Sequence, residues 1–111
     1  MRRVTTAVVV ILLAACAPAL AQGAKVARGE KVFTDQKCSL CHSIGGHGNA
    51  KGILDDVGAK LSADEIRQWI TNAKEMTAKT NATRKPAMKQ FTLPKDDVDA
   101  LVAYLQTLKG K

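Results

Sequence analysis

The stretch "KCSLCHSIGG", residues 37–46, places two cysteines three positions apart and a histidine directly after the second cysteine. Such a cluster has three ordinary uses in proteins: a redox dithiol, half of a metal site, or the covalent attachment site of a haem. Which use applies depends on the elements and further ligands that the rest of the chain provides.

The first 21 residues have the pattern of an export signal. Residues 1–3 form a short positive start, an apolar run follows, and Ala19-Leu20-Ala21 is a small-x-small cleavage site. The run is shorter than the roughly 20 apolar residues that a spanning helix needs, so we expect no transmembrane span. We therefore predict a signal peptide over 1–21 and one soluble, periplasmic domain over 22–111.

A second cleavage site is present just upstream. Leu13-Ala14-Ala15-Cys16 resembles the lipobox of bacterial lipoproteins, in which Cys16 would carry lipid and become the new N-terminus. Cleavage after Ala21 would instead remove Cys16 and leave no unpaired thiol in an oxidising compartment. The sequence favours cleavage after Ala21, with a lipid-anchored form as the alternative.

The remaining chain is small and basic. The sequence has 17 Lys and Arg residues; loss of Arg2 and Arg3 leaves 15 against 10 Asp and Glu, a net charge of +5. A chain of about 90 residues is near the size at which a single hydrophobic core is marginal. Its aromatic residues are Phe33, Trp69, Phe91 and Tyr104. A buried apolar cofactor would supply the missing core.

The sequence predicts three helices. The first is expected over 24–35 and leads directly into the cysteine pair. The second starts at the capping box Ser62-Ala63-Asp64-Glu65 and has an apolar face. The third, over 96–108, has apolar residues at helical spacing.

The intervening segments carry no strand pattern. Residues 43–60 contain five glycines and are expected to form loops with tight turns. Residues 72–91 lack a sustained apolar stripe and are expected to be mostly extended or loop. The predicted fold class is all-α.

Two uses of the cysteine motif fit this organisation poorly. A redox dithiol is expected near a βαβ pattern, and no sheet is predicted. A zinc site would take Cys38, Cys41, His42 and His47, but structural zinc usually binds two well-separated ligand pairs, whereas Cys41 and His42 are neighbours. Nucleic-acid binding is not expected either, because no recognition motif is present.

Haem attachment uses every member of the motif. Cys38 and Cys41, about one helical turn apart, would form thioethers with the two vinyl groups of a haem, and His42 would be the proximal iron ligand. C-x-x-C-H is the sequence signature of this linkage, which is made outside the cytoplasm.

An electron-carrying haem also needs a sixth ligand, and a thioether raises its potential. Met88 lies in "RKPAMKQF", a stretch without regular pattern, which suits a loop that crosses the haem face. Met76 follows the second helix, where methionine more often fills core space. We favour Met88, with Met76 as the alternative and His47 as an outside candidate.

These motifs together resemble those of a class I cytochrome c of the small, soluble, monohaem bacterial type. The resemblance covers residues 29–108. Its motifs are the attachment motif CSLCH, the first-helix pattern at 29–33, the middle helix at 61–70, the ligand loop at 88–91 and the final helix at 100–108.

The resemblance implies a cytochrome c fold of three main helices with loops wrapped around one covalently bound haem. It also implies that Leu101 packs over Gly29, that Tyr104 lies near Phe33, and that Trp69 lies near a haem propionate. The implied role is single-electron transfer by a carrier that is not itself an enzyme.

The chain departs from the family pattern at two places. The glycine-rich loop reads "KGILDDVG" and lacks the usual proline, so the carbonyl that receives the second N–H of His42 is expected near Gly52 or Ile53. Lys89 also replaces the usual proline after Met88. Neither departure removes a ligand.

The charge distribution indicates the kind of partner. Residues 74–95 hold six cations and one acidic residue, a charge of +5. We therefore expect docking on redox proteins with acidic patches, at rates that depend on salt, and we expect the protein to be a monomer. The six are Lys74, Lys79, Arg84, Lys85, Lys89 and Lys95. The alternatives are a haem enzyme or gas sensor with an open sixth site, and a cytochrome subunit of a larger oxidoreductase.

Overall fold

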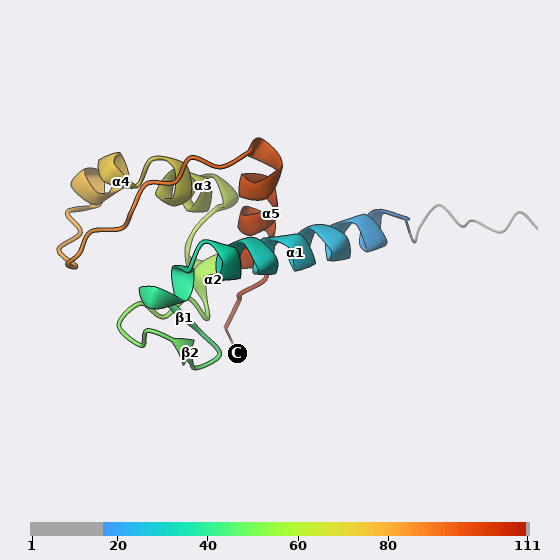
Figure 1. The fold of residues 1–111 in the computed structure, drawn as a ribbon, viewed down its shortest axis with the longest axis horizontal. Coiled ribbons are helices and arrows are strands. Elements are labelled where there is room, and N and C mark those ends of the chain that lie inside the picture. The colour runs from blue at the N-terminus through green and yellow to red at the C-terminus, as the bar shows by residue number, and fades with distance from the viewer. Residues whose placement is uncertain (1–16, 111) are drawn as a thin grey trace, which may run out of the picture.

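The computed structural model describes residues 17–110, and it is mostly helical, as predicted (Figure 1). A two-stranded hairpin and a short 3₁₀ turn interrupt the helices. In chain order the elements are α1 (Ala17–Asp35), η2 (Cys38–Leu40), β1 (Ser43–Ile44), β2 (His47–Gly48), α2 (Val57–Lys60), α3 (Ala63–Thr71), α4 (Ala73–Thr80) and α5 (Lys95–Gln106).

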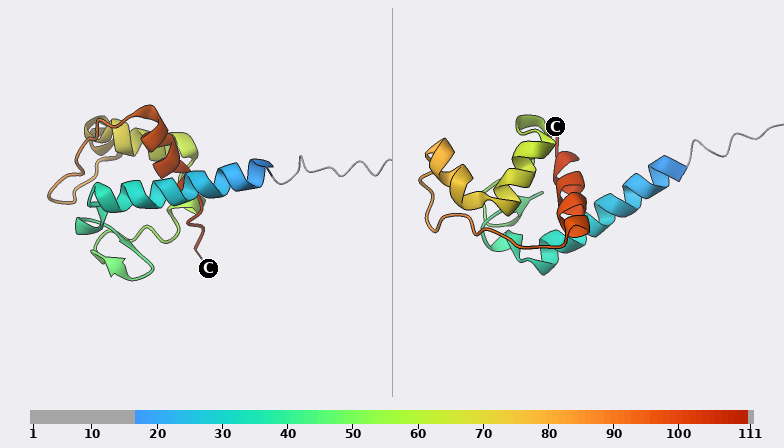
Figure 2. Two further views of the ribbon diagram at one scale, coloured as in Figure 1. Left: turned by 45° about the vertical axis from the view of Figure 1, so that its right-hand side comes forward. Right: turned by 90° about the horizontal axis from the view of Figure 1, so that it is seen from above.

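The centre of the fold is the crossing of α1 and α5, which share the most extensive contact between any two elements (Figures 1 and 2). Gly29 is buried at this crossing, and a Cβ there would stand 2.6 Å from both the carbonyl carbon of Ala100 and Tyr104 Cβ. One turn further along α1, Phe33 meets Tyr104 edge to face with ring centroids 6.1 Å apart. A glycine is therefore what allows the two backbones to approach.

The expected packing of Leu101 over Gly29 stays a prediction. The atoms nearest to Gly29 belong to Ala100 and Tyr104, which lie one turn apart on the same face of α5. Leu101, next to Ala100 in the chain, lines an apolar cavity. The expected proximity of Tyr104 to Phe33 is confirmed.

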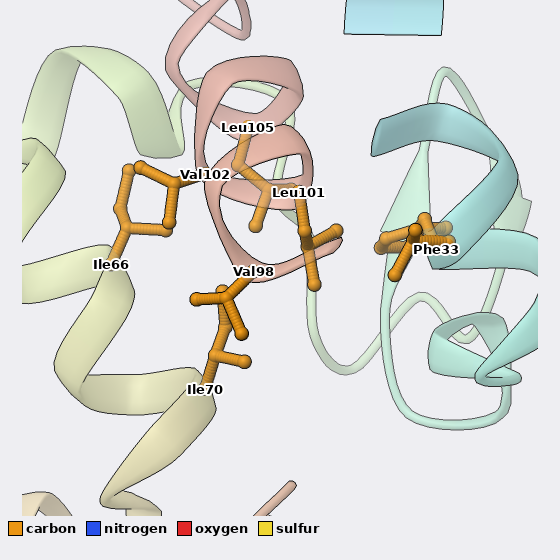
Figure 3. Packing of buried hydrophobic residues seen from close by; sticks show 8 residues of the cluster. Phe33, Ile66, Ile70, Val98, Leu101, Val102 and Leu105 are labelled. Carbon is orange, nitrogen blue, oxygen red and sulfur yellow. The ribbon is translucent and has the colours of Figure 1, made fainter. Parts of the chain in front are cut away.

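The other side of α5 packs against α3. Figure 3 shows Ile66 and Ile70 of α3 pointing toward Val98 and Val102 of α5, while Phe33 approaches from the α1 side. An ion-pair network joins the same two helices, because Asp99 contacts both Arg67 and Lys95, at 2.7 and 2.8 Å. These hydrogen-bonding cations hold the pKa of Asp99 below its usual range.

The predicted start of α3 is confirmed. Ser62 Oγ accepts a hydrogen bond from the Glu65 backbone N–H, and the Glu65 carboxylate accepts one from the Ser62 N–H, both at 3.1 Å. This reciprocal capping satisfies two of the four amide groups that the first turn of a helix leaves unpaired.

Replacing Ser62 by alanine is expected to lower the free energy of unfolding by about 1 kcal/mol, because the cap of α3 is lost. Chemical denaturation of the haem-loaded protein would measure this change in the free energy of unfolding. Thr92→Ala is the control, since the exposed Thr92 side chain makes no hydrogen bond within residues 17–110. Equal stability of the Ser62 variant and the wild type would contradict a stabilising role for the cap.

Two further helices lie where loops were expected. α4 occupies part of 72–91, and α2 is a single turn within 43–60. α4 was missed because only Ala73 is buried, so it has no apolar stripe. It forms from good helix formers, and Asn72 at its start donates a hydrogen bond of 2.6 Å to Glu75. The expected three main helices are therefore accompanied by two shorter ones.

The hairpin was also not predicted. Ser43 pairs with Gly48 and Ile44 with His47, across a turn at Gly45 and Gly46, whose φ angles are 59° and 82°. Positive φ at both turn positions suits a two-residue hairpin. Strands of two residues are too short to show an alternating pattern, which explains why the sequence indicates only loop here.

The first helix begins earlier than the expected residue 24. It starts at Ala17, so the predicted cleavage site after Ala21 lies within α1, and the side chains of residues 19–25 are exposed. Most of the predicted signal peptide, including Cys16, lies outside the described residues. Processing at either site stays a prediction. Within residues 17–110, no helix is both long and apolar enough to cross a membrane.

Candidate functional site

The two cysteines and the histidine lie on one tight turn that follows α1. Lys37, with a left-handed φ of 57°, ends the helix and starts η2. The Cys38 carbonyl oxygen accepts hydrogen bonds from Cys41 N at 3.1 Å and His42 N at 2.9 Å. The turn holds the two thiols and the imidazole in a fixed relation, as the motif predicts.

Both thiols are free, but their surroundings differ. Cys38 is half-buried and Cys41 is exposed. Burial raises the pKa of the Cys38 thiol to about 11, with a smaller increase from the neighbouring Cys41. Cys38 is therefore protonated at neutral pH in this environment.

His42 is held by the backbone of the glycine-rich loop. Its Nδ1 lies 3.1 Å from the Gly52 carbonyl oxygen, which also accepts the Ser43 N–H at 2.9 Å. Because a carbonyl can only accept, Nδ1 carries the proton and Nε2 is left with a free lone pair. Of the two carbonyls that the sequence allowed, Gly52 and Ile53, the structure has Gly52.

The surroundings of the imidazole favour its neutral form. Burial is the main cause that lowers the pKa of His42, and the nearby positive charge of Arg84 adds to it, while the hydrogen bond to Gly52 acts in the opposite direction. A neutral imidazole with one nitrogen fixed by a carbonyl is the form that binds a metal ion.

These residues open onto an apolar cavity with a volume of about 270 Å³. Its walls come from α1, the cysteine turn, α3, α5 and the segment between α4 and α5. Most of the lining side chains are apolar. The larger ones are Phe33, Leu54, Leu61, Ile66, Trp69, Ile70, Phe91, Leu93, Leu101 and Leu105.

Of the three candidate distal ligands, only Met88 lines the cavity. Met88 lies on the cavity wall together with Cys38, Cys41 and His42, although it is 46 positions from His42 in the chain. Met76 lies on α4 and is not among the lining residues. His47 lies on β2, exposed and away from the cavity. Trp69, on α3, also lines the cavity, and its position near a haem propionate stays a prediction.

The donor set fits a haem. Two thiols suit thioether bonds, a neutral imidazole and a thioether suit the axial positions of an iron, and an apolar cavity suits the macrocycle. A zinc site has less support, since residues 17–110 contain no group of three or more His, Cys, Asp or Glu side chains arranged to hold a metal ion. The four zinc ligands considered above are therefore not brought together.

The basic residues of 74–95 surround the segment that carries Met88. Five of the six cations are exposed, and Arg84 is half-buried. Lys95 is paired with Asp99, and the Lys89 ammonium lies 5.4 Å from the centroid of the Phe91 ring. A basic surface therefore adjoins one side of the cavity.

Sequence reasoning did not single out Arg84 as a site residue. In the sequence it is one of six cations, whereas in the structure it is the one of the six that lines the cavity. No local pattern could separate it from its neighbours, because its place depends on the path of the segment between α4 and α5.

Comparisons with known proteins identify the family of the chain. Residues 26–109 match the family model for cytochrome c. Over 91 residues the chain is 26% identical to cytochrome c oxidase subunit 2 of Alkalihalophilus pseudofirmus; the match covers 74% of this chain and 25% of that protein. No solved structure matches significantly. On the family match, which spans the cysteine turn, the cavity and α5, the chain belongs to the cytochrome c family.

Proposed function

We propose that this protein is a periplasmic electron carrier with one covalently attached haem, held by His42 and Met88 as axial ligands. The observation that carries the proposal is that Cys38, Cys41, His42 and Met88 line a single apolar cavity. Family membership supports haem binding and electron transfer in general. The ligand set, the covalent attachment and the compartment are the further steps proposed here.

Each residue would have a separate role. Cys38 and Cys41 would hold the haem through thioether bonds, and His42, oriented by the Gly52 carbonyl, would present Nε2 to the iron. Met88 would fill the opposite position and exclude small molecules from it. When bound, the haem supplies a centre that gains and loses single electrons.

The surrounding residues would control the environment of that centre. The apolar side chains of the cavity exclude water, and a low dielectric with a sulfur ligand favours a high potential. The exposed lysines next to the cavity would orient the protein toward acidic patches on its redox partners, with rates that fall as salt rises. With both axial positions filled, the protein would carry electrons and would not act as an enzyme.

The ligand assignment is tested by the far-red absorption band of the oxidised, haem-loaded protein, which reports an iron–sulfur bond. We expect Met88→Ala to lose this band completely, because no other side chain of the cavity wall supplies a thioether. Met76→Ala is the matched control and should keep it.

The same preparations test attachment. The reduced protein should show a sharp α-band, and the haem should stay on the chain under denaturing conditions. A high-spin spectrum in the wild type would instead indicate an open sixth position, as in a haem enzyme or gas sensor. A colourless product would contradict haem binding itself.

A place in a larger oxidoreductase is a second candidate, favoured by the match to an oxidase subunit. This chain spans about a quarter of that protein's length, so the match concerns one domain. Co-purification from native membranes, compared with recovery from the periplasmic fraction, would separate a complex subunit from a free carrier.

A further inference from the structure

Arg84 has an unusual position for a cation. It is half-buried and lines the cavity, and it makes no ion pair or hydrogen bond with any of residues 17–110. Placing an unpaired charge in a mostly apolar wall costs free energy, so the position of Arg84 needs an explanation. The residues around its guanidinium indicate one.

The guanidinium reaches Gly52. The point at which a Cβ of residue 52 would stand is contacted by Arg84 Nη1 and by the Cys41 carbonyl oxygen, and it lies 2.9 Å from His42 Nδ1. Because Gly52 has no side chain, the guanidinium of Arg84 can lie against it. Gly52 is also the residue whose carbonyl orients His42. The Cys41 carbonyl oxygen accepts no backbone hydrogen bond within the described residues, so it offers an acceptor at the same place.

The segment that carries Met88 needs such a contact. Its N-terminal end is held by Ala82 N donating to Thr77 O at 3.0 Å, and its C-terminal end by Phe91 N donating to Ile70 O at 2.9 Å. Between these bonds, residues 83–90 make no backbone–backbone hydrogen bond within residues 17–110. The place of Met88 therefore depends on side-chain contacts.

We propose that Arg84 is a positioning residue that ties the Met88 segment to Gly52, so that the segment of the distal ligand is held against the loop that orients His42. Arg84 precedes Met88 by four residues, and Gly52 is the residue whose carbonyl accepts the His42 N–H. The inference rests on the proposed function, because it takes Met88 as the distal ligand. The contact is one of close packing, because Arg84 Nη1 fills the space that a side chain at residue 52 would occupy.

Binding of imidazole to the oxidised, haem-loaded protein measures this role. Imidazole can reach the iron only when Met88 has left it, so its apparent affinity is proportional to the fraction of molecules with Met88 released. Because imidazole is neutral, loss of a protein charge does not by itself alter its attraction to the site. We expect Arg84→Gln to bind it roughly tenfold more tightly than the wild type.

Lys85→Gln is the matched control. Lys85 is adjacent, exposed and not on the cavity wall, and the substitution removes the same charge. Its imidazole affinity should equal that of the wild type. An equal increase in the Arg84 and Lys85 variants would overturn the proposal, because the effect would then be one of net charge.

The Met88→Ala background separates the two proposals. Met88→Ala alone should bind imidazole more tightly than Arg84→Gln or Lys85→Gln. Adding Arg84→Gln to Met88→Ala should not change the affinity further, since Arg84 acts through Met88. A further tenfold gain in that background would overturn the role of Arg84 and leave the Met88 assignment intact. Wild-type affinity in Met88→Ala would overturn the distal ligand, and with it the inference.

Discussion

Without haem, the domain is expected to lose its cooperative fold. A Cys38→Ala/Cys41→Ala chain, produced where haem cannot be attached, should have little helical signal in far-UV circular dichroism and no sharp thermal transition. The reason is that the cofactor cavity is part of the core. Of the eight residues in the buried cluster, Phe33, Ile66, Ile70, Leu101 and Leu105 also line the cavity.

The size of the effect follows from the cavity volume. At about 24 cal/mol per Å³, a dry cavity of 270 Å³ corresponds to about 6 kcal/mol. The whole stability of a small domain is about 5 to 15 kcal/mol. The haem-loaded wild type serves as the reference, and a cooperative thermal transition in the haem-free chain would show that the helices support one another without the cofactor.

Gly29→Ala is expected to destabilise the haem-loaded protein by about 3 kcal/mol, although alanine is the better helix former. The new methyl group would stand 2.6 Å from the Ala100 carbonyl carbon and from Tyr104 Cβ. Neither atom can rotate away, since one is backbone and the other is fixed to it, so α1 and α5 must separate. For a domain of this size the midpoint of thermal unfolding should fall by roughly 15 °C.

Gly23→Ala is the control with the opposite sign. It introduces the same methyl group into the same helix, at a position with no atom within 4 Å. There the helix propensity of alanine should dominate, with a gain of at most about 1 kcal/mol. If the two variants changed stability in the same direction, the close helix crossing would not be the reason for glycine at residue 29.

The sequence predicts well those elements whose signals are local. The capping box at Ser62 begins α3 where expected, and the apolar spacing after residue 95 corresponds to α5. α4 escaped prediction because it buries only Ala73, and an exposed helix has no apolar stripe to detect. The hairpin escaped because two-residue strands have no period.

The site residues also differ in whether a local sequence signal indicates their place. The turn that carries Cys38, Cys41 and His42 is a local motif, and its backbone hydrogen bonds close within four residues. The loop character of its surroundings favours Met88 over Met76; Met88 lies on the cavity wall, and its role as ligand stays a prediction. The contact of Arg84 with Gly52 joins residues 32 positions apart, and nothing in either neighbourhood indicates it.

The exposed first turns of α1 bear on how the domain could be attached to a surface or to another polypeptide. Residues 19–23 are all exposed, and the approach of α1 to α5 begins at Ala24 and Lys25, which line a pocket together with Asp96, Asp99 and Ala100. Trimming, tethering or fusing the chain in this stretch would leave the packed body unchanged. The domain is therefore portable: one core could be released by a protease, fixed to a surface, or linked to a larger polypeptide without a change in its interior.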